Sequence, residues 1–321
     1  MTAEVQGTAR HRSWREVDGI VLLDKPAGMS SNQALQRARR LLSAAKGGHA
    51  GTLDPMATGM LPLCLGQATK ACGQLLGSSK CYGAAIALGS ATDTGDADGT
   101  VVAESPVAAL TREQVERVLA GFRGDIEQVP PMYSALKRDG RPLYELARRG
   151  EEVLRKSRRV HIERLDLLSL GERELAIEVV CSKGTYVRVL GEDIARALGT
   201  CGHLGALRRL WVQPFEGEGM VTLEAIEDWA AGGAAMPPPW LMPVERAFTG
   251  LPRLDLDEVR SLQLRQGRVL EAPAALGRSG LAAAFGPDGR FLGLVAIDEG
   301  GQVRVERLFV PGAGGASSPK T

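Results

Sequence analysis

One stretch of the chain isolates a single carboxylate among uncharged residues. In residues 47–69 the only formally charged side chain is Asp54. Pro55 disfavours the α region for Asp54, while Gly51 and Gly59 let the backbone bend and approach a partner closely. A buried carboxylate is costly unless it is paired or hydrogen-bonded. The pattern is therefore typical of a carboxylate held on a rigid, bent loop for chemistry, or of an Asx turn that merely closes a loop.

A second chemical pair is Tyr186 and Arg188. We predict a strand over 184–190, running into a helix over 193–198, so that these two side chains share one face of the strand. An aromatic ring can stack on a nucleobase, and a guanidinium can neutralise a buried carboxylate through two hydrogen bonds. A half-exposed strand without a ligand explains the same pattern equally well.

Basic side chains gather in residues 137–159. This segment holds nine Lys and Arg against four Asp and Glu, a local charge of +5, whereas the whole chain sums to +1. Such a cluster on a nearly neutral chain favours a polyanion footprint, although a solvated face is the commoner explanation of one charge run. We therefore expect an irregular, basic, RNA-binding insertion over about 124–158.

The bulk composition excludes several classes of protein. The chain has 321 residues, 44% apolar and 24% charged, which is ordinary for a globular protein with room for two domains. It has no apolar run of membrane-spanning length and no secretory signal pattern near residue 1, so we expect a cytoplasmic protein with no membrane contact. Five cysteines without a C-x-x-C pair indicate reduced thiols.

Metal and cofactor motifs are missing from the sequence. The four histidines are scattered without ligand spacing, and no phosphate-binding or dinucleotide-binding glycine motif occurs. Asp93, Asp96 and Asp98 do not match the spacing of a calcium loop. The sequence thus predicts no metal site and no cofactor.

Turn and capping signals divide the chain into segments. We expect a flexible tail over 1–15, a main domain over 16–240, a small β-rich domain over 241–310 and a disordered tail over 311–321. The glycine-rich and proline-rich residues 231–239 form the clearest linker. Thr111 and Gln114 form a capping box, and residues 287–289 predict a hairpin turn between two of three C-terminal strands.

An ordered set of short blocks resembles the TruB family of pseudouridine synthases. The block GHAGTLDPMATG around Asp54 carries the resemblance, and further blocks at 23–31, 80–82, 92–99, 129–144, 181–188 and 207–210 follow in the family's order. Small departures are Ala50, Met56 and Gly202, where Thr, Leu and Ala are usual. None of them removes a reactive group.

This resemblance implies a fold, a substrate and a reaction. The fold is α+β, with a catalytic domain built on a mixed, largely antiparallel sheet flanked by helices and a small β-rich, PUA-like RNA-binding domain at the C-terminal end. The reaction is isomerisation of uridine 55 in the T-loop of tRNA to pseudouridine, after base flipping and without a cofactor. We expect a monomer that grips the T-arm, because the substrate is one folded RNA and no coiled-coil pattern appears. We expect no guide RNA and no obligate protein partner, because the sequence shows no long basic tail and no extra domain for partner proteins.

The resemblance also implies roles for single residues. Asp54 matches the catalytic aspartate, Arg188 its pairing arginine and Tyr82 the tyrosine that stacks on the target base. The remaining matches are Tyr186 as a second active-site tyrosine, His49 and Leu207 lining the nucleotide pocket, and Lys25 and Pro26 supporting the catalytic loop. For His49, a loop-stabilising hydrogen bond is an equal alternative.

The chemistry agrees with these assignments. Conversion of uridine to pseudouridine breaks the C1′–N1 bond and joins C1′ to C5, so no group or electron leaves. Asp54 could attack C6, attack C1′ or assist by removing a 2′-proton. We expect Arg188 to hold it ionised and no other carboxylate to reach the base. The alternative function is a tRNA-binding folding chaperone in which isomerisation is secondary.

Overall fold

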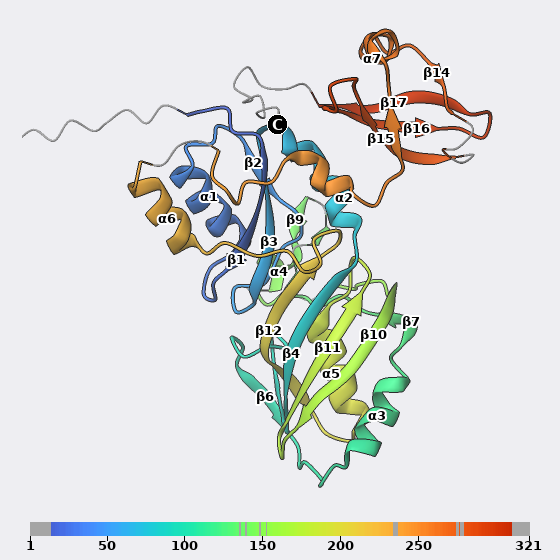
Figure 1. The fold of residues 1–321 in the computed structure, drawn as a ribbon. Helices are drawn as coiled ribbons and strands as arrows, with labels where there is room; N and C mark the ends of the chain where they lie inside the picture. Colours follow the sequence, from blue (N-terminus) through green and yellow to red (C-terminus); the bar gives the residue numbers. More distant parts are fainter. Residues whose placement is uncertain are drawn as a thin grey trace, which may run out of the picture.

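The computed structural model describes residues 14–134, 136–138, 140–147, 149–151, 153–233, 237–273, 276 and 279–309. Almost all of the two predicted tails and the centre of the predicted linker lie outside the described residues. Figure 1 shows a main body around one long sheet and a smaller sheet at one side. No helix of the described part is long and apolar enough to cross a membrane.

The main body is built on an eight-stranded sheet. Its strands are β1 (Gly19–Lys25), β2 (Gly47–His49), β3 (Thr58–Leu65), β4 (Lys80–Leu88), β7 (Gly124–Gln128), β10 (Arg158–Leu170), β11 (Glu174–Cys181) and β12 (Gly202–Val212). The order is β1-β3-β12-β4-β11-β10-β7, and β2 also pairs with β3. Every pair is antiparallel except β12 with β3. The predicted mixed, largely antiparallel sheet is confirmed.

Helices cover the sheet unevenly. α1 (Ser31–Leu41) and α6 (Leu223–Ala231) lie beside β1, whereas α3 (Arg112–Ala120) and α5 (Val187–Ala197) lie behind the half formed by β4, β10, β11 and β12 (Figure 1). The capping box of Thr111 and Gln114 forms as predicted, and Ser30 with Gln33 makes a second one on α1. A two-stranded pair, β5 (Ser90–Thr92) and β6 (Val101–Glu104), and the short helix α2 (Cys72–Gly77) complete this region.

The predicted strand at 184–190 is wrong. Tyr186 is the N-cap of α5, and Arg188 lies in the first turn of that helix. The buried positions Val187, Leu190, Gly191, Ile194 and Ala195 follow the i, i+3, i+4, i+7 spacing of a helix face. Local β-branched and aromatic residues suggested a strand, but this longer pattern wins because it buries one helix face against β12 and β4.

The insertion is shorter than predicted. Its first residues, 124–128, form β7, which pairs with β10 as an edge strand of the main sheet. Beyond Gln128 the chain makes a small hairpin of β8 (Lys137–Arg138) and β9 (Arg141–Pro142), followed by the short helix α4 (Leu143–Ala147). Periodicity missed β7 because three of its five residues, Gly124, Asp125 and Gln128, are poor strand formers.

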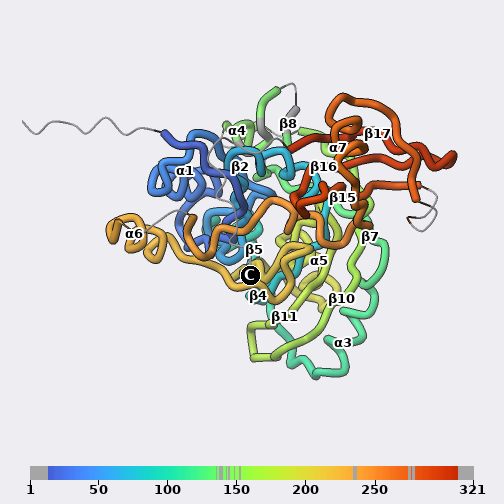
Figure 2. Tube along the Cα trace, turned by 45° about the horizontal axis from the view of Figure 1, so that its top comes forward, coloured from blue at the N-terminus to red at the C-terminus, as the bar shows by residue number. Residues whose placement is uncertain are grey.

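A five-stranded sheet forms the C-terminal unit. Its strands are β13 (Arg253–Asp255), β14 (Leu270–Glu271), β15 (Gly280–Phe285), β16 (Phe291–Ile297) and β17 (Gln302–Leu308), in the order β13-β15-β16-β17-β14, beside the helix α7 (Glu258–Arg265). The predicted hairpin between β15 and β16 is present. Figure 2 shows this unit beside the main body rather than inserted into its sheet.

An aromatic cluster joins the two units. Phe248, Phe285, Phe291 and Phe309 pack with ring centroids 5.1–5.7 Å apart. They are four of the six phenylalanines of the chain, and they share one buried cluster with apolar side chains of β1 and β3. Aromatic rings bury large apolar areas, so this cluster fixes the C-terminal sheet against the body.

Replacing Phe291 by Ala should therefore lower the free energy of unfolding by about 3–5 kcal/mol, the usual loss for a buried aromatic side chain. Chemical denaturation measures it. The matched control is Leu262→Ala on α7, where the side chain is 58% exposed and little should change. Equal losses in the two variants would show that the cluster does not stabilise the fold.

Candidate active site

Asp54 lies on a loop between β2 and β3, which we call the Asp54 loop (residues 50–57). Ser31, in the first turn of α1, clamps this loop by bonding both backbone groups of Leu53, at 2.8 Å from its N–H and 3.1 Å from its carbonyl. The Ala57 N–H closes a turn onto the Asp54 carbonyl at 3.1 Å. The loop is therefore a tethered turn, and the carboxylate projects from a fixed backbone.

Lys25 supports the same loop from beneath. Its side chain is fully buried, and its Nζ donates to the carbonyls of Pro26 (2.8 Å), Met29 (2.6 Å) and Pro55 (3.2 Å). Burial lowers the pKa of Lys25 to about 8, although the Asp54 carboxylate opposes this shift. Lys25 thus binds the carbonyl directly after Asp54, and Pro26 supplies one of its acceptors.

Arg188 is the direct partner of Asp54. The Arg188 Nε lies 3.0 Å from Asp54 Oδ2, and the guanidinium is only 5% exposed. Its other nitrogens donate to the carbonyls of Thr94 and Tyr133, each at 2.6 Å. The predicted pairing of Asp54 with Arg188 is present in the geometry, although a helix rather than a strand presents the arginine.

A second carboxylate, Asp96, shares Arg188. Its Oδ2 lies 3.7 Å from the Arg188 Nε, and the Thr94 hydroxyl and the Asp98 N–H hold its other oxygen. The sequence analysis gave Asp96 no role, although it lies in one of the matching blocks. Asp54 nevertheless remains the only carboxylate among the described residues that line the cavity.

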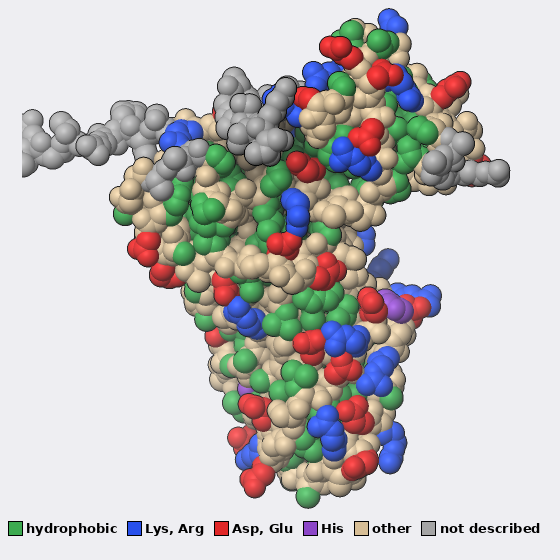
Figure 3. All heavy atoms as spheres, viewed as in Figure 1, with side chains coloured by type: hydrophobic (Ala, Val, Ile, Leu, Met, Phe, Trp, Pro, Cys, Tyr) green, Lys and Arg blue, Asp and Glu red, His purple; other side chains and the backbone are tan. Residues whose placement is uncertain are grey.

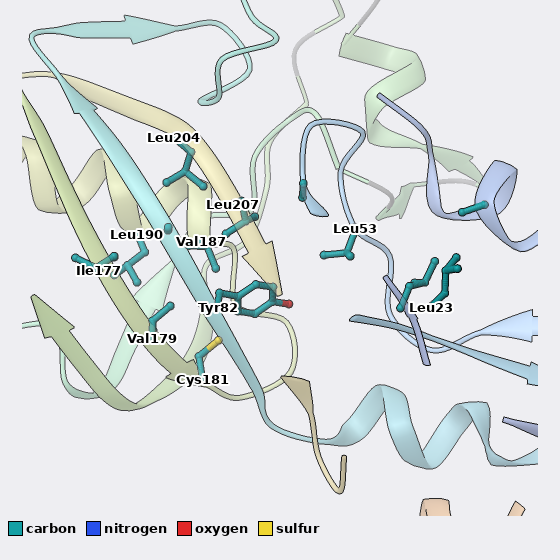
Figure 4. Close-up of a cluster of buried hydrophobic side chains, with 14 of the residues drawn as sticks. Leu23, Leu53, Tyr82, Ile177, Val179, Cys181, Val187, Leu190, Leu204 and Leu207 are labelled. Atoms are coloured by element: carbon teal, nitrogen blue, oxygen red, sulfur yellow. The ribbon is translucent and has the colours of Figure 1, made fainter. Parts of the chain in front are cut away.

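The Asp54 carboxylate opens into a cavity of about 230 Å³. Its lining includes Tyr82, Tyr186, Arg188 and Leu207, all predicted from the sequence. Figure 4 shows the Tyr82 ring projecting from β4 towards Leu53 and lying near Leu207. The space is smaller than the roughly 300–1,000 Å³ of pockets for drug-sized ligands, which suits a single nucleobase.

The two tyrosines are fixed by different means. Tyr82 is 8% exposed and lies opposite Arg209 in the pairing of β4 with β12. Tyr186 exchanges two backbone hydrogen bonds with the side chain of Gln128, at 3.0 and 3.2 Å. Burial raises the pKa of both phenols, so both stay neutral.

His49 and Pro26 do not line this cavity. His49 ends β2, opposite Leu63 of β3, and its Nδ1 is buried without a hydrogen-bond partner in the described part of the chain. Burial, together with the nearby Arg209, lowers the pKa of His49. His49 therefore lies behind the Asp54 loop as a neutral side chain.

Two cations of the cavity wall were missed. Lys80 bonds the carbonyls of Leu76 (3.3 Å) and Ser78 (2.5 Å), and burial lowers its pKa to about 8. Arg209 is fully buried and bonds the carbonyls of Met60 (2.7 Å) and Gly51 (3.0 Å). Both stand in blocks that resemble the TruB family. Nothing in the local sequence, however, indicates that charged side chains on these strands would point into the protein.

Burial dominates the electrostatics of Asp54. The surrounding protein raises the pKa of the carboxyl group, Asp96 raises it further, and Arg188 and Lys25 lower it. The net shift is upward. Arg188, expected to hold Asp54 ionised, thus opposes the upward shift of the Asp54 pKa without reversing it.

Known protein families and relatives that match this chain provide further evidence of its family. Residues 39–187 match the model of the TruB family pseudouridylate synthase N-terminal domain. Residues 188–249 match the tRNA pseudouridylate synthase B C-terminal domain, and 251–309 match the tRNA pseudouridine synthase II C-terminal model. The tRNA pseudouridine synthase B of Aromatoleum aromaticum is 52% identical over 93% of this chain and 94% of its own length. The chain belongs to the TruB family.

Two further relatives agree. The tRNA pseudouridine synthase B of Chromohalobacter salexigens is 49% identical over 94% of this chain and 97% of its own length. Among solved structures, a chain of a Cbf5-Nop10-Gar1 complex has a TM-score of 0.71 and 26% identity, over 94% of this chain and 86% of that one. The family and the pseudouridine synthase fold expected from the sequence are confirmed.

The raised pKa of Asp54 predicts a stability effect. A carboxyl group whose pKa is higher in the folded than in the unfolded state destabilises the fold at a pH where it is ionised in both states. This destabilisation is lost as the pH falls, first through the pKa of the folded state and then through that of the unfolded state. Asp54→Asn removes the charge, so the variant should unfold at a higher urea concentration than the parent at pH 7.5, and the difference should shrink towards pH 4. A variant less stable than the parent at neutral pH would contradict the predicted direction.

Proposed function

We propose that this chain isomerises uridine to pseudouridine in tRNA, at uridine 55 of the T-loop, with Asp54 as the essential carboxylate. The observation that carries the proposal is the Asp54–Arg188 pair, 3.0 Å apart at the wall of a base-sized cavity that also has two tyrosines in its lining. The names of the relatives support tRNA as the substrate.

The reaction needs what this cavity offers. The C1′–N1 bond breaks, the base turns and C5 bonds to C1′, while the C5 proton leaves. Asp54 serves as nucleophile at C6 or C1′, or removes a 2′-proton, and each route requires the ionised carboxylate. Arg188 holds the carboxylate oxygen in place, and the raised pKa makes that oxygen a stronger base and nucleophile.

The target base must leave its stack to reach Asp54. Tyr82 then supports it by stacking, an interaction of about 1–3 kcal/mol per base. Leu207, next to Tyr82 in Figure 4, packs against the same base, and Tyr186 lines the same cavity. Lys25 and Pro26 hold the Asp54 loop in place.

The basic insertion supplies the grip on the T-arm. Arg149 is exposed on it, and Arg158 and Arg159 are exposed at the start of β10, where the insertion ends. Arg188 ties the insertion to the site through the Tyr133 carbonyl. On the face drawn in Figure 3, basic and acidic side chains are interspersed, which does not favour a phosphate backbone there. The same chain carries both the cavity beside Asp54 and the basic insertion that we propose binds the T-arm. We therefore infer a monomer without guide RNA or obligate protein partner.

The C-terminal unit completes the proposed organisation. We assign 16–240 to the catalytic domain and 241–310 to a PUA-like RNA-binding domain. The aromatic cluster docks that domain on β1 and β3, and β3 directly follows the Asp54 loop in sequence. This docking supports an RNA-binding surface held at a fixed distance from the cavity.

Changing Asp54 to Asn should abolish pseudouridine formation in T-arm RNA, by at least about a thousandfold, since removal of a nucleophile leaves only binding and positioning. Pseudouridine mapping after single turnover measures it. RNA affinity should stay within about threefold, because the phosphate contacts that dominate affinity are elsewhere. Retained turnover would refute the role of Asp54. Normal cell fitness of the inactive variant would favour the folding-chaperone function.

Replacing Arg149, Arg158 and Arg159 together by Gln should weaken tRNA binding. It should also flatten the salt dependence of log K by about 0.7–0.9 for each phosphate that the variant no longer neutralises. Arg148, predicted with them, lies outside the described residues. The control is Arg117→Gln on α3, an exposed arginine outside the basic segment of residues 137–159. An unchanged slope in the triple variant would place the footprint elsewhere.

A further inference from the structure

The charges around the cavity do not balance. Its lining holds three cations, Lys80, Arg188 and Arg209, and one carboxylate, Asp54. Arg188 is occupied by Asp54 and Asp96. The other two cations bond backbone carbonyls, and no carboxylate in the described part of the chain forms an ion pair with either. The side chains around the cavity therefore carry an excess of positive charge.

This excess is expensive to bury. Arg209 is 0% exposed and Lys80 is 7% exposed, and a buried ion without a counter-ion destabilises a fold by several kcal/mol. Each cation also disfavours the other, because Arg209 adds to burial in lowering the pKa of Lys80 to about 8. Such an arrangement indicates that an anion occupies the cavity at some stage of the working cycle.

The two cations flank the stacking tyrosine. Arg209 lies opposite Tyr82 across the β4–β12 pairing, and its guanidinium faces the Tyr82 hydroxyl. Lys80 precedes Tyr82 by two residues on β4, so both side chains leave the strand on the same side. Because Lys80, Tyr82 and Arg209 all line the cavity, a base resting on Tyr82 would lie close to both positive charges.

We propose that Lys80 and Arg209 form an anion site for the uracil base once it has left the ribose. This inference rests on the proposed function. When the C1′–N1 bond breaks, its electron pair stays on N1 and spreads over O2 and O4, so the detached base is an anion. Cations placed where charge develops only during reaction stabilise the transition state and not the ground state.

The site serves each of the routes open to Asp54. If the carboxylate attacks C1′, an ester forms and uracil leaves as the anion; loss of a 2′-proton expels the same anion. Attack at C6 places negative charge on the ring before the bond breaks. In every case C5 later bonds to C1′ and loses its proton while N1 takes up a proton, so atoms and electrons balance without an oxidant. Charge attraction is weakly directional, which lets the base turn while it is held.

The direct test reads the ionisation of a base inside the cavity. A T-arm hairpin carries 5-nitrouridine at the target position, because this ring ionises near neutral pH and its anion absorbs at a longer wavelength. It is bound to the Asp54→Asn variant, which stops chemistry. The pKa of the bound probe should be lower than that of the free hairpin. Adding Lys80→Met should raise it again by about one unit, a tenfold change in ionisation.

The control for charge alone is Arg117→Met, since Arg117 is exposed on α3 and outside the cavity lining. It should leave the probe unchanged. Equal probe pKa values with and without Lys80 would overturn the proposal. If the double variant does not fold, Asp54→Asn alone decides, because a bound probe no easier to ionise than the free hairpin would also overturn it.

Kinetics supply a second, separable readout. In the otherwise intact chain, Lys80→Met should slow single-turnover pseudouridine formation about 100-fold and change hairpin affinity less than about threefold, and Lys80→Arg should recover most of the rate. A loss carried mainly by affinity would overturn the anion site. Failure of the parent chain to form pseudouridine at all would instead refute the proposed function.

Discussion

The buried guanidinium of Arg188 is the group on which the rest of the site depends. It joins four segments that are distant in sequence: the Asp54 loop, the turn at Thr94–Asp96, the start of the insertion at Tyr133 and the first turn of α5. Loss of this ion would leave two carboxylates without their partner, at about 3–5 kcal/mol for a broken buried pair. Its burial therefore couples the position of Asp54 to that of the insertion.

The sheet topology explains why these segments meet. β3 and β12 make the one parallel pairing among the described strands of the large sheet, at Arg208–Thr58 and Arg209–Gly59. This short seam joins the half that carries the Asp54 loop to the half that carries Tyr82 and α5. Gly59 has a φ of +96°, and a Cβ there would collide with the Arg209 carbonyl oxygen, so the close approach requires glycine.

The sequence predicted Asp54, Arg188 and the two tyrosines of the cavity, but not the other charged residues of the site. Asp54 could be predicted because its isolation among uncharged residues is a local pattern. Arg188 could be predicted because a carboxylate that does chemistry needs a counter-ion. The sequence did not predict Asp96, Lys80 and Arg209, because their roles depend on contacts between strands and loops that are far apart in the chain. The strand expected at Tyr186 failed for a related reason: seven residues cannot distinguish a strand from the start of an amphipathic helix.

The cations beneath the Asp54 loop hold main-chain carbonyls, not side chains. Lys25 binds at Pro55 and Arg209 at Gly51, so neither anchor depends on which side chains the loop carries. The residue types at positions such as Ala50 and Met56 can then differ between relatives without displacing the carboxylate. Gly51, whose φ is +91°, is under the opposite constraint. Much of the Asp54 loop can therefore change in sequence without displacing the Asp54 carboxylate.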